Sequence, residues 1–564
     1  MLETDVCTIN AKLVERNGKL FLFLLVLSYY SLSKRVGHVS GRLSCPSNHH
    51  IHRVASMRRR IVKILLFITV TYSALCSGQI VPIQTPLEAA RYARISTSNE
   101  ISRYIHALAG RYPALVRVES IGRSVLDRPI EVIRFSLPRS DDSVKRLTVM
   151  IVGSQHGAAE PAGGEALLII ARELADGYLR PLLEEMDVIL LPNANPDGRD
   201  LGRRSNANRV NINTDFVLLT QPETRILRDA VARYVPDVLL DSHESAVLKR
   251  ETLATEGYLT DFDAQFEISN NPAVPAVLRD YALNTFLPAL TGRVTDGGLP
   301  AHRYIGEITR IKQPITNGGL TLRNFRNAAA MSGALSLLAE TKLDSREQVF
   351  PTYRNIAQRV ARQLLCLRSF LTLAHEQRAE IQAKTAVARA ALHRESLTLY
   401  AGYALNQAQP RTSIPMRRLD NGQLQQLDFP DHRQQLNADE IAFPSMLVIT
   451  RHQDIIRPLL DRHRIDYQPV LRSSEYEMVA MRLNVPANSL MRAGLLAETQ
   501  KTLTIDRGSL LINLFQPNGR AAALLLDPRS ISSIFRYPEY ASLVEPETEF
   551  FIYRIAEKIL LGQP

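Results

Sequence analysis

Residues 146–161 decide the fold, and they read Arg-Leu-Thr-Val-Met-Ile-Val-Gly-Ser-Gln-His-Gly-Ala-Ala-Glu-Pro. The first half is an apolar run without polar alternation, which is typical of a strand buried on both faces. A short loop follows, and from Pro161 to about Ala175 the apolar residues recur at helical spacing. A strand buried on both faces needs covering layers above and below, so this stretch indicates an α/β layer fold.

The same alternation of strands and helices extends outward over residues 79 to about 349. The turn Pro192-Asn193-Ala194-Asn195-Pro196-Asp197-Gly198 interrupts it after one apolar run. The expected strands lie at 187–191, 237–241 and 334–339, with a helix at Pro222–Tyr234. We therefore expect a three-layer α/β/α domain around a mixed, largely buried sheet.

The pattern changes after this domain. Residues 352 to about 393 form a long helical stretch with few breakers, and it contains Cys366, which we expect in the core. From Ser396 onward, loops rich in Gln, Pro and Arg alternate with short apolar runs such as 503–515, which indicates β-structure. We predict four parts: an N-terminal segment at 1–78, the α/β domain at 79–350, a helical connector at 351–395, and a smaller β-rich C-terminal domain at 396–564.

Composition agrees with a multidomain globular protein. The chain has 564 residues, of which 45% are hydrophobic and 22% are charged. Its net charge is +11, but residues 1–78 hold eleven basic and three acidic side chains and so carry +8. The remaining 486 residues are nearly neutral, and they contain no nucleic-acid-binding motif, so we expect no nucleic-acid partner.

The charged N-terminal region has the pattern of a secretory signal. Met57-Arg58-Arg59-Arg60 precedes an apolar run at 61–75 and the small residues Cys76-Ser77-Gly78. We expect Met57 to be the true start and residues 1–56 to be an upstream extension. The run is short for a membrane span of about 20 residues, so an uncleaved anchor is the alternative. The predicted location is periplasmic or secreted, with membrane contact only through this segment. Cys366 is then the single cysteine of the body, which excludes an internal disulfide.

Candidate metal ligands follow two of the expected strands. His156 and Glu160 follow the strand at 146–153, and His243 follows the strand at 237–241. The carboxyl ends of strands are where α/β sheets build their sites. Two imidazoles and one carboxylate suit zinc and leave a position open for water, as in catalytic sites. Either short motif alone is more often structural than metal-binding.

Two further segments carry candidate catalytic groups. The apolar strand at 334–339 delivers Glu340, which could act as a general base beside a metal-activated water. The loop at 203–216 carries Arg203 and Arg204, and a paired guanidinium can polarise a carbonyl oxygen or bind a carboxylate. Taken alone, Glu340 would be a surface acid and the arginine pair a solvated basic loop.

Together, the order and spacing of these segments resemble the zinc carboxypeptidase family, the carboxypeptidase A-like metallopeptidases. Ile121-Gly122-Arg123-Ser124 with Asp127-Arg128-Pro129-Ile130 is similar to the family's early segment IGxSxxGRPI, with Asp127 in place of its glycine. Asn195-Pro196-Asp197-Gly198 matches its NPDG turn. The resemblance covers roughly residues 84–345. Later segments, 514–517 and 525–530, look like the tail of some larger bacterial members with a C-terminal extension.

The resemblance implies a role for each candidate. His156, Glu160 and His243 would bind one zinc ion, and Glu340 would be the general base. Arg204, or else Arg203, would polarise the scissile carbonyl. Asn213 falls where the family's asparagine helps to hold the terminal carboxylate of a peptide substrate.

Three positions depart from the family pattern. His156 and Glu160 are spaced HxxxE in place of HxxE; the family's DxNR reads Asn211-Ile212-Asn213-Thr214. Asn211 thus replaces a carboxylate that orients a ligand histidine, and Thr214 replaces the arginine that clamps the substrate's carboxylate. The arginines that could substitute are Arg323 and Arg326, and Tyr304 is a candidate for the family's mobile tyrosine.

We therefore expect an exported zinc metallopeptidase of carboxypeptidase type. It would hydrolyse a peptide or amide bond by zinc-activated water, with Glu340 as general base. The departures leave two alternatives open: an amidase for cell-wall peptides, or a catalytically impaired peptide-binding protein on the same scaffold.

Overall fold

The computed structural model describes residues 83–138, 145–246, 256–306, 308–343, 354–484 and 493–555. The chain divides into two units, Met1–Val81 and Pro82–Pro564, and only the second contains described residues. The first unit lies outside the described residues, and so do the predictions made for it: the signal segment, the start at Met57 and the export. Within the described ranges, no helix combines the length and the hydropathy that a membrane span requires.

An eight-stranded mixed sheet forms the centre of the second unit, in the order β1-β2-β4-β3-β5-β9-β7-β8. The four central strands β4, β3, β5 and β9 are parallel, whereas β1, β2 and β7 pair with antiparallel neighbours. The strands are β1 (Val116–Arg123), β2 (Pro129–Phe135), β3 (Leu147–Gly153), β4 (Met186–Leu191), β5 (Val238–Ala246), β7 (Ala264–Ile268), β8 (Ala301–Arg303) and β9 (Leu335–Leu343).

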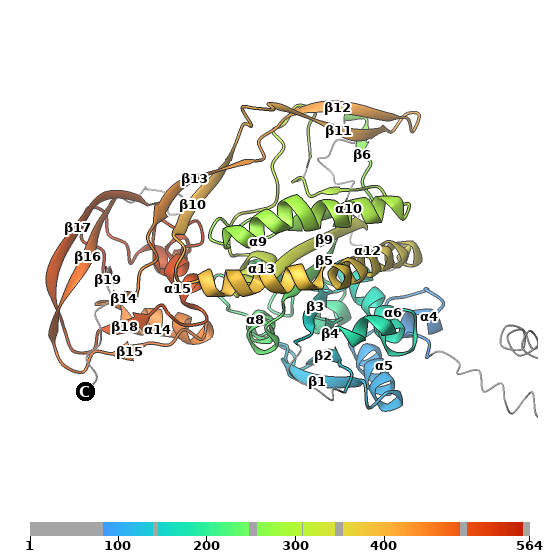
Figure 1. Ribbon diagram of the computed structural model, residues 1–564, viewed down its shortest axis with the longest axis horizontal. Helices are drawn as coiled ribbons and strands as arrows, with labels where there is room; N and C mark the ends of the chain where they lie inside the picture. The colour runs from blue at the N-terminus through green and yellow to red at the C-terminus, as the bar shows by residue number, and fades with distance from the viewer. Residues whose placement is uncertain are drawn as a thin grey trace, which may run out of the picture. The chain divides into compact units, whose positions relative to one another are not determined.

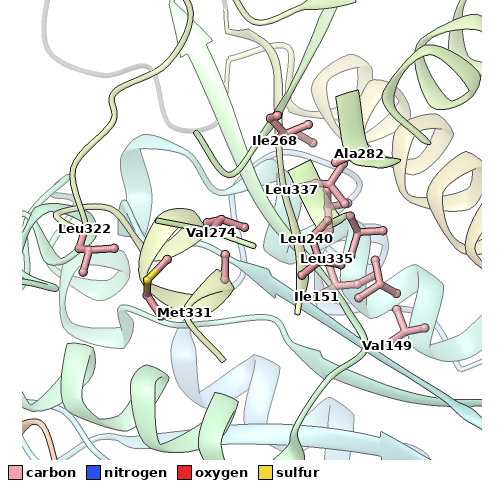
Figure 2. Close-up of a cluster of buried hydrophobic side chains, with 14 of the residues drawn as sticks. Val149, Ile151, Leu240, Ile268, Val274, Ala282, Leu322, Met331, Leu335 and Leu337 are labelled. Atoms are coloured by element: carbon pink, nitrogen blue, oxygen red, sulfur yellow. The ribbon is translucent and has the colours of Figure 1, made fainter. Parts of the chain in front are cut away.

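Successive residues of the central strands point into two different cores. On β3, Val149 and Ile151 belong to one buried cluster, while Met150 and Val152 belong to the other. Ile151, Leu240 and Leu337 are register partners on β3, β5 and β9, and Figure 2 shows them side by side. The unbroken apolar run of β3 is therefore the consequence of burial on both faces.

Helices cover both faces of the sheet (Figure 1). Among the described residues 83–391, the helices that contribute to the first core are α4 (Pro86–Ala89), α5 (Ser98–Arg111), α6 (Ala162–Asp176), α9 (Ala276–Tyr281), α10 (Leu287–Asp296), α12 (Ile356–Glu376) and α13 (Arg378–Ala391). The second core is shared with α8 (Pro222–Tyr234) and α11 (Phe325–Ala330). The predicted three-layer α/β/α class with a mixed, buried sheet is confirmed.

The segment 351–395 is helical where described, and Cys366 is buried within the first core, as expected. Helix α12 packs along α6 and β9, so it forms part of the covering layer. The proposed boundaries at 350/351 and 395/396 stay predictions.

The C-terminal part is rich in β-structure, as predicted. Its strands are β10 (Leu397–Ala404), β11 (Arg411–Arg418), β12 (Leu424–Pro430), β13 (Gln434–Ile441), β14 (Met446–Ile449), β15 (Gln468–Pro469), β16 (Ser474–Asn484), β17 (Gly494–Ile505), β18 (Leu510–Asn513) and β19 (Ile552–Ile555). Six of them form one sheet in the order β15-β18-β14-β19-β16-β17. The sequence did not lead us to expect the helices α14 (Gln453–Arg462) and α15 (Gly519–Leu526) within this part.

Candidate zinc site

The candidate site lies at the carboxyl ends of the parallel strands β3, β5 and β9. His243 and Glu340 are register partners on β5 and β9, so the two side chains emerge next to each other. Gly153, the last residue of β3, pairs with Ser242, which places the loop after β3 beside the same edge. In the chain, Glu340 is 97 positions from His243 and 184 positions from His156. The three residues meet because the three strands run in the same direction, so that their carboxyl ends lie at one edge of the sheet.

The loop after β3 accommodates the additional residue of the HxxxE spacing in a tight turn. Residues Gly157–Ala159 form the 3₁₀ helix η1, and the Ala159 amide donates to the His156 carbonyl at 3.0 Å. Gly157 has φ +50°, and a Cβ there would lie 2.5 Å from the backbone carbon of Gly198. The extra residue is therefore absorbed in the turn, which returns Glu160 to the side of His156.

His156, Glu160 and His243 form a buried cluster whose ligand atoms all lie within 4.8 Å of one another. Glu160 Oε2 lies 3.0 Å from His243 Nδ1. The His156 Nδ1 atom is buried without a hydrogen-bond partner among the described residues. Buried polar atoms normally have partners, so this orphan nitrogen suits a metal ligand. The three predicted metal ligands are thus brought together, and their donor set fits zinc.

Arg204 places a positive charge against the same cluster. Its Nη1 donates to Glu160 Oε1, and its Nη2 lies 2.9 Å from His156 Nε2. The guanidinium thus contacts two of the three candidate metal ligands directly. The Arg204 side chain is 38% exposed, so part of it also faces solvent.

The charges of the cluster shift the pKa of each ligand. Burial lowers the pKa of His156 well below its usual range, which keeps the imidazole neutral and able to bind a metal. Burial alone would raise the pKa of Glu160, but His156 and Arg204 lower it on balance. Burial opposes the charge of His243, yet the Asp241 carboxylate raises its pKa well above the usual value.

Glu340 lies partly exposed at the edge of this cluster. Burial and the nearby Glu160 carboxylate raise the pKa of Glu340 to about 7, although the His243 charge opposes that rise. A carboxylate whose pKa lies close to neutral pH can both accept and return a proton. The position suits the general base that the sequence predicts.

Asn213 connects the metal cluster to the start of α11. Its Nδ2 lies 3.3 Å from His243 Nε2, and its Oδ1 accepts a hydrogen bond from the Phe325 amide at 2.9 Å. Arg326 is the next residue after Phe325, and its side chain is buried. The Arg323 side chain is exposed, and the Arg323 carbonyl accepts a hydrogen bond from the Phe216 amide. Of the two arginines that could replace the family's carboxylate-binding arginine, Arg326 therefore lies on α11, the helix whose start is bonded to Asn213.

Other predicted residues have local roles in the structure. Asn211 Oδ1 accepts from the Asn213 amide at 3.1 Å, and the Thr214 hydroxyl donates to the Asn211 carbonyl at 2.9 Å. The Arg203 side chain is exposed, and its carbonyl accepts from the Ala158 amide at 3.1 Å. Tyr304 follows β8, and its amide donates to the Phe266 carbonyl at 2.7 Å.

Sequence reasoning missed Asp241, which supports a ligand histidine. Its Oδ1 lies 3.0 Å from His243 Nε2 and accepts from Gln155 Nε2 at 2.6 Å. A carboxylate behind a ligand histidine fixes the ring orientation. The signal was present, because residues two apart on a strand share a face and Asp241 precedes His243 by two.

A second missed group braces the strands from α12. Arg359 forms a fully buried pair with Glu244, with Nε at 2.7 Å and Nη2 at 2.9 Å from the carboxylate oxygens. Gln363, one turn later, donates to the His243 carbonyl at 2.7 Å and to the Thr341 hydroxyl at 2.8 Å. These contacts tie the strand of a metal ligand to the strand of Glu340.

Comparison with known proteins agrees with this geometry. Residues 101–230 match the family model described as zinc carboxypeptidase. The chain is similar to carboxypeptidase 2 of Trichophyton rubrum, with 28% identity over 204 residues, or 36% of this chain and 38% of the relative. It is also similar to carboxypeptidase D of Homo sapiens, with 34% identity over 143 residues, or 19% of this chain and 10% of the relative. The match thus spans less than half the length of these curated relatives.

Two solved structures are similar over about half of the chain. The carboxypeptidase A from Helicoverpa armigera has a TM-score of 0.38 and 17% identity, and it covers 50% of this chain and 75% of its own. A metallo-carboxypeptidase from Burkholderia cenocepacia has a TM-score of 0.37 and 18% identity, and it covers 51% and 71%. The part of the chain that matches the zinc carboxypeptidase model, residues 101–230, contains His156 and Glu160 of the buried triad, and His243 of β5 completes the triad.

Proposed function

We propose that this protein is a zinc metallocarboxypeptidase that removes residues from the C-terminus of a peptide substrate. The observation that carries the proposal is the register pairing of His243 with Glu340 beside His156 and Glu160. His156, Glu160 and His243 would hold a zinc ion, which when bound would supply a Lewis acid for the scissile carbonyl and lower the pKa of a water molecule. Glu340 accepts the proton of that water and later delivers it to the leaving amine.

Two further residues serve the same reaction in this proposal. The Arg204 guanidinium, anchored on Glu160, donates hydrogen bonds to the carbonyl oxygen as negative charge develops there. Asn213 presents its amide towards the substrate's terminal carboxylate, and the Phe325 amide holds it in that position. Arg326 supplies the positive charge that Thr214 lacks, since the Thr214 hydroxyl is already bonded within its own turn.

A peptide panel tests the substrate. Matched peptides with a free C-terminal carboxylate and with a C-terminal amide should be hydrolysed at different rates, the free carboxylate being faster by at least tenfold. Preference for the amide or for cross-linked cell-wall peptides would favour the second candidate, an amidase, which the lack of a charged side chain at Thr214 supports. Less than stoichiometric zinc, with no hydrolysis of either set, would leave a peptide-binding protein.

The proton transfer is tested by Glu340→Gln. The variant should keep full zinc occupancy and lose about 10²- to 10⁴-fold in kcat, the range that general base catalysis supplies. Glu380→Gln, the same substitution at an exposed position of α13, is the matched control and should keep wild-type activity. Retention of activity in Glu340→Gln would contradict the assignment.

We also propose export to the periplasm or the medium, which the basic and apolar pattern of residues 57–78 supports. The sequences of segments 514–517 and 525–530 support assignment to the larger bacterial type of the family, although the two curated relatives described above are fungal and human. N-terminal sequencing of the mature protein tests the export: a mature start near residue 79 is expected, and a peptide from residues 1–56 would contradict it.

A further inference from the structure

The segment 315–322, which leads into α11, is held by the C-terminal part at both of its ends. The Ile315 amide donates to the Pro430 carbonyl at 2.9 Å. Ile315 is also buried in an apolar cluster with side chains of β11 and β12. At the other end, the Leu322 amide donates to the Ser532 hydroxyl oxygen at 2.9 Å. The path of this segment is therefore set by residues that lie much later in the chain.

Tyr403 of β10 holds the middle of the same segment. Its hydroxyl donates to the Gly318 carbonyl at 2.8 Å, and that carbonyl accepts a second bond from Asn270 Nδ2 at 3.1 Å. The Gly318 amide donates to Glu267 Oε2 at 2.9 Å. Burial raises the pKa of Tyr403, so its hydroxyl keeps the proton that it donates. One of the three bonds that fix Gly318 thus comes from the C-terminal part.

Gly318 lies directly against the guanidinium of Arg326. A Cβ on Gly318 would lie 2.7 Å from Arg326 Nη2, which is too close for two atoms that are not bonded. The backbone of Gly318 therefore limits where the guanidinium can lie. A shift of Gly318 would leave Arg326 free to take other positions.

The guanidinium of Arg326 has donors to spare. The residue is 4% exposed, and its side chain has no hydrogen bond or ion pair with any other residue that the structure describes. Nε is fully enclosed, whereas Nη1 and Nη2 are not, so a ligand can reach the end of the guanidinium. The two Nη atoms can donate to both oxygens of one carboxylate, and a buried cation without a counterion favours such a partner.

Arg326 is held on the face of the sheet that carries the general base. Glu267, which accepts from the Gly318 amide, is the register partner of Leu338, and Leu338 precedes Glu340 by two positions on β9. Residues two apart on a strand share a face of the sheet, and so do register partners on neighbouring strands. Glu267 and Glu340 therefore lie on one face, with Gly318 and Arg326 packed beside Glu267.

We propose that the C-terminal part takes part in substrate recognition. In this proposal Tyr403 is a positioning residue, which acts through Gly318 to hold the Arg326 guanidinium in place for the terminal carboxylate of a peptide. The inference rests on the proposed function, in which Arg326 supplies the charge for that carboxylate. A bidentate pair depends on the placement of both partners, so the loss of one bond to Gly318 weakens it.

Calorimetric titration of zinc-loaded, full-length Glu340→Gln protein tests the proposal, because slow turnover permits binding to be measured. The probes are acetylated tripeptides that end in leucine, phenylalanine, lysine or glutamate, each as the free carboxylate and as the C-terminal amide. Adding Tyr403→Phe should weaken binding of the free carboxylates about two- to tenfold, the value of one hydrogen bond, and leave the amides unchanged. A merely structural loss would weaken both forms alike.

A double-mutant cycle shows whether Tyr403 acts through Arg326. Arg326→Met should weaken binding of the free carboxylates by about tenfold or more, because it removes a charged hydrogen-bond partner. In the Arg326→Met background, Tyr403→Phe should have no further effect. Tyr553→Phe is the matched control, since it removes a hydroxyl bond of 2.7 Å to Glu549 elsewhere in the C-terminal part and should change neither form.

Gly318→Ala is a second variant that reaches Arg326 without Tyr403. Its Cβ would displace Arg326 Nη2, so the same selective loss is expected, and the thermal unfolding midpoint shows that each variant is folded. The proposal is overturned if folded Tyr403→Phe and Gly318→Ala bind the free carboxylates as tightly as the Glu340→Gln protein, or lose both forms equally. Equal binding of the two forms by the Glu340→Gln protein itself would instead contradict the proposed function, and the inference with it, before any change at Tyr403.

Discussion

At the scale of single residues, the carboxylate that orients a ligand histidine has a different location from the one the family pattern implies. Asn211 stands where the resemblance places that carboxylate, and its side chain caps the 3₁₀ helix η3 (Ile212–Thr214). Asp241 instead contacts His243 Nε2, and it lies on the same strand and face as that ligand. Carboxylate support for a ligand histidine is thus present in this protein, from Asp241 to His243.

Asp241→Asn tests this support. The substitution keeps the shape of the side chain and removes the charge, so the dissociation constant for zinc should rise about 10- to 100-fold, as for other residues that orient metal ligands. Competition with a zinc chelator measures the change. Asp200→Asn, at a carboxylate that pairs with Arg128 outside the cluster, is the control. An unchanged zinc affinity in Asp241→Asn would contradict the role.

A single departure from the family pattern is also explained at this scale. Asp127 replaces a glycine of the family's early segment, and it adopts φ +60° in the turn between β1 and β2. Aspartate tolerates this left-handed conformation better than most residues. Its carboxylate also pairs with Arg123, four residues earlier, at 3.0 Å. The family's early turn can therefore form without its glycine.

At the scale of elements, α12 holds the strands that carry the site. The pair of Arg359 and Glu244 is fully buried, and Glu244 follows the metal ligand His243 directly. Burial raises the pKa of Glu244, and the Arg359 guanidinium opposes that rise. Because the Ala162 amide also donates to Glu244, the same carboxylate fixes the start of α6.

Arg359→Met should lower the free energy of unfolding by about 3 kcal/mol, because it leaves a buried carboxylate unpaired. The double variant Glu244→Gln with Arg359→Met should lose less than the sum of the two single changes, since no buried charge remains. Urea unfolding of all four proteins measures the coupling. Strict additivity of the two single losses would show that the pair does not act as a unit.

At the scale of the whole molecule, the C-terminal part is attached to the α/β part by buried polar contacts. His463, at the end of α14, lies with its Nε2 2.9 Å from the Val217 carbonyl, and Arg462 Nε donates to the Leu218 carbonyl at 2.9 Å. Arg520 of α15 is buried and donates to the Ala273 carbonyl at 2.6 Å. These contacts join segments more than 200 residues apart in the chain.

The His463 contact predicts a loss of stability in acid. Burial lowers the pKa of His463 to about 3, well under its ordinary value of 6.5. Below pH 6.5 the unfolded chain binds a proton that the folded protein does not, so stability is complete above pH 6.5 and falls as the pH drops towards 3. Between pH 7 and pH 5, His463 should account for a loss of about 2 kcal/mol.

His463→Gln keeps a donor for the Val217 carbonyl and removes the titrating group. Its free energy of unfolding, measured by urea at pH 7 and pH 5, should therefore fall by about 2 kcal/mol less than that of the wild type over the same interval. Equal losses in the two proteins would show that His463 does not titrate in this range.

The sequence by itself determined the local parts of this protein. The periodicity of 146–153 and 222–234 predicted β3 and α8, because burial on two faces or on one helical face leaves a pattern in neighbouring residues. The residue types of His156, Glu160 and His243 predicted a zinc site, since ligand chemistry belongs to the side chains themselves.

Only the tertiary structure decided which of these parts meet. The pairing of His243 with Glu340 depends on strand register, and the bonds from Arg204 to Glu160, from Arg359 to Glu244 and from His463 to Val217 join residues 44, 115 and 246 positions apart. Contacts of this kind arise from the packing of whole elements, and packing leaves no periodic signal in a single sequence.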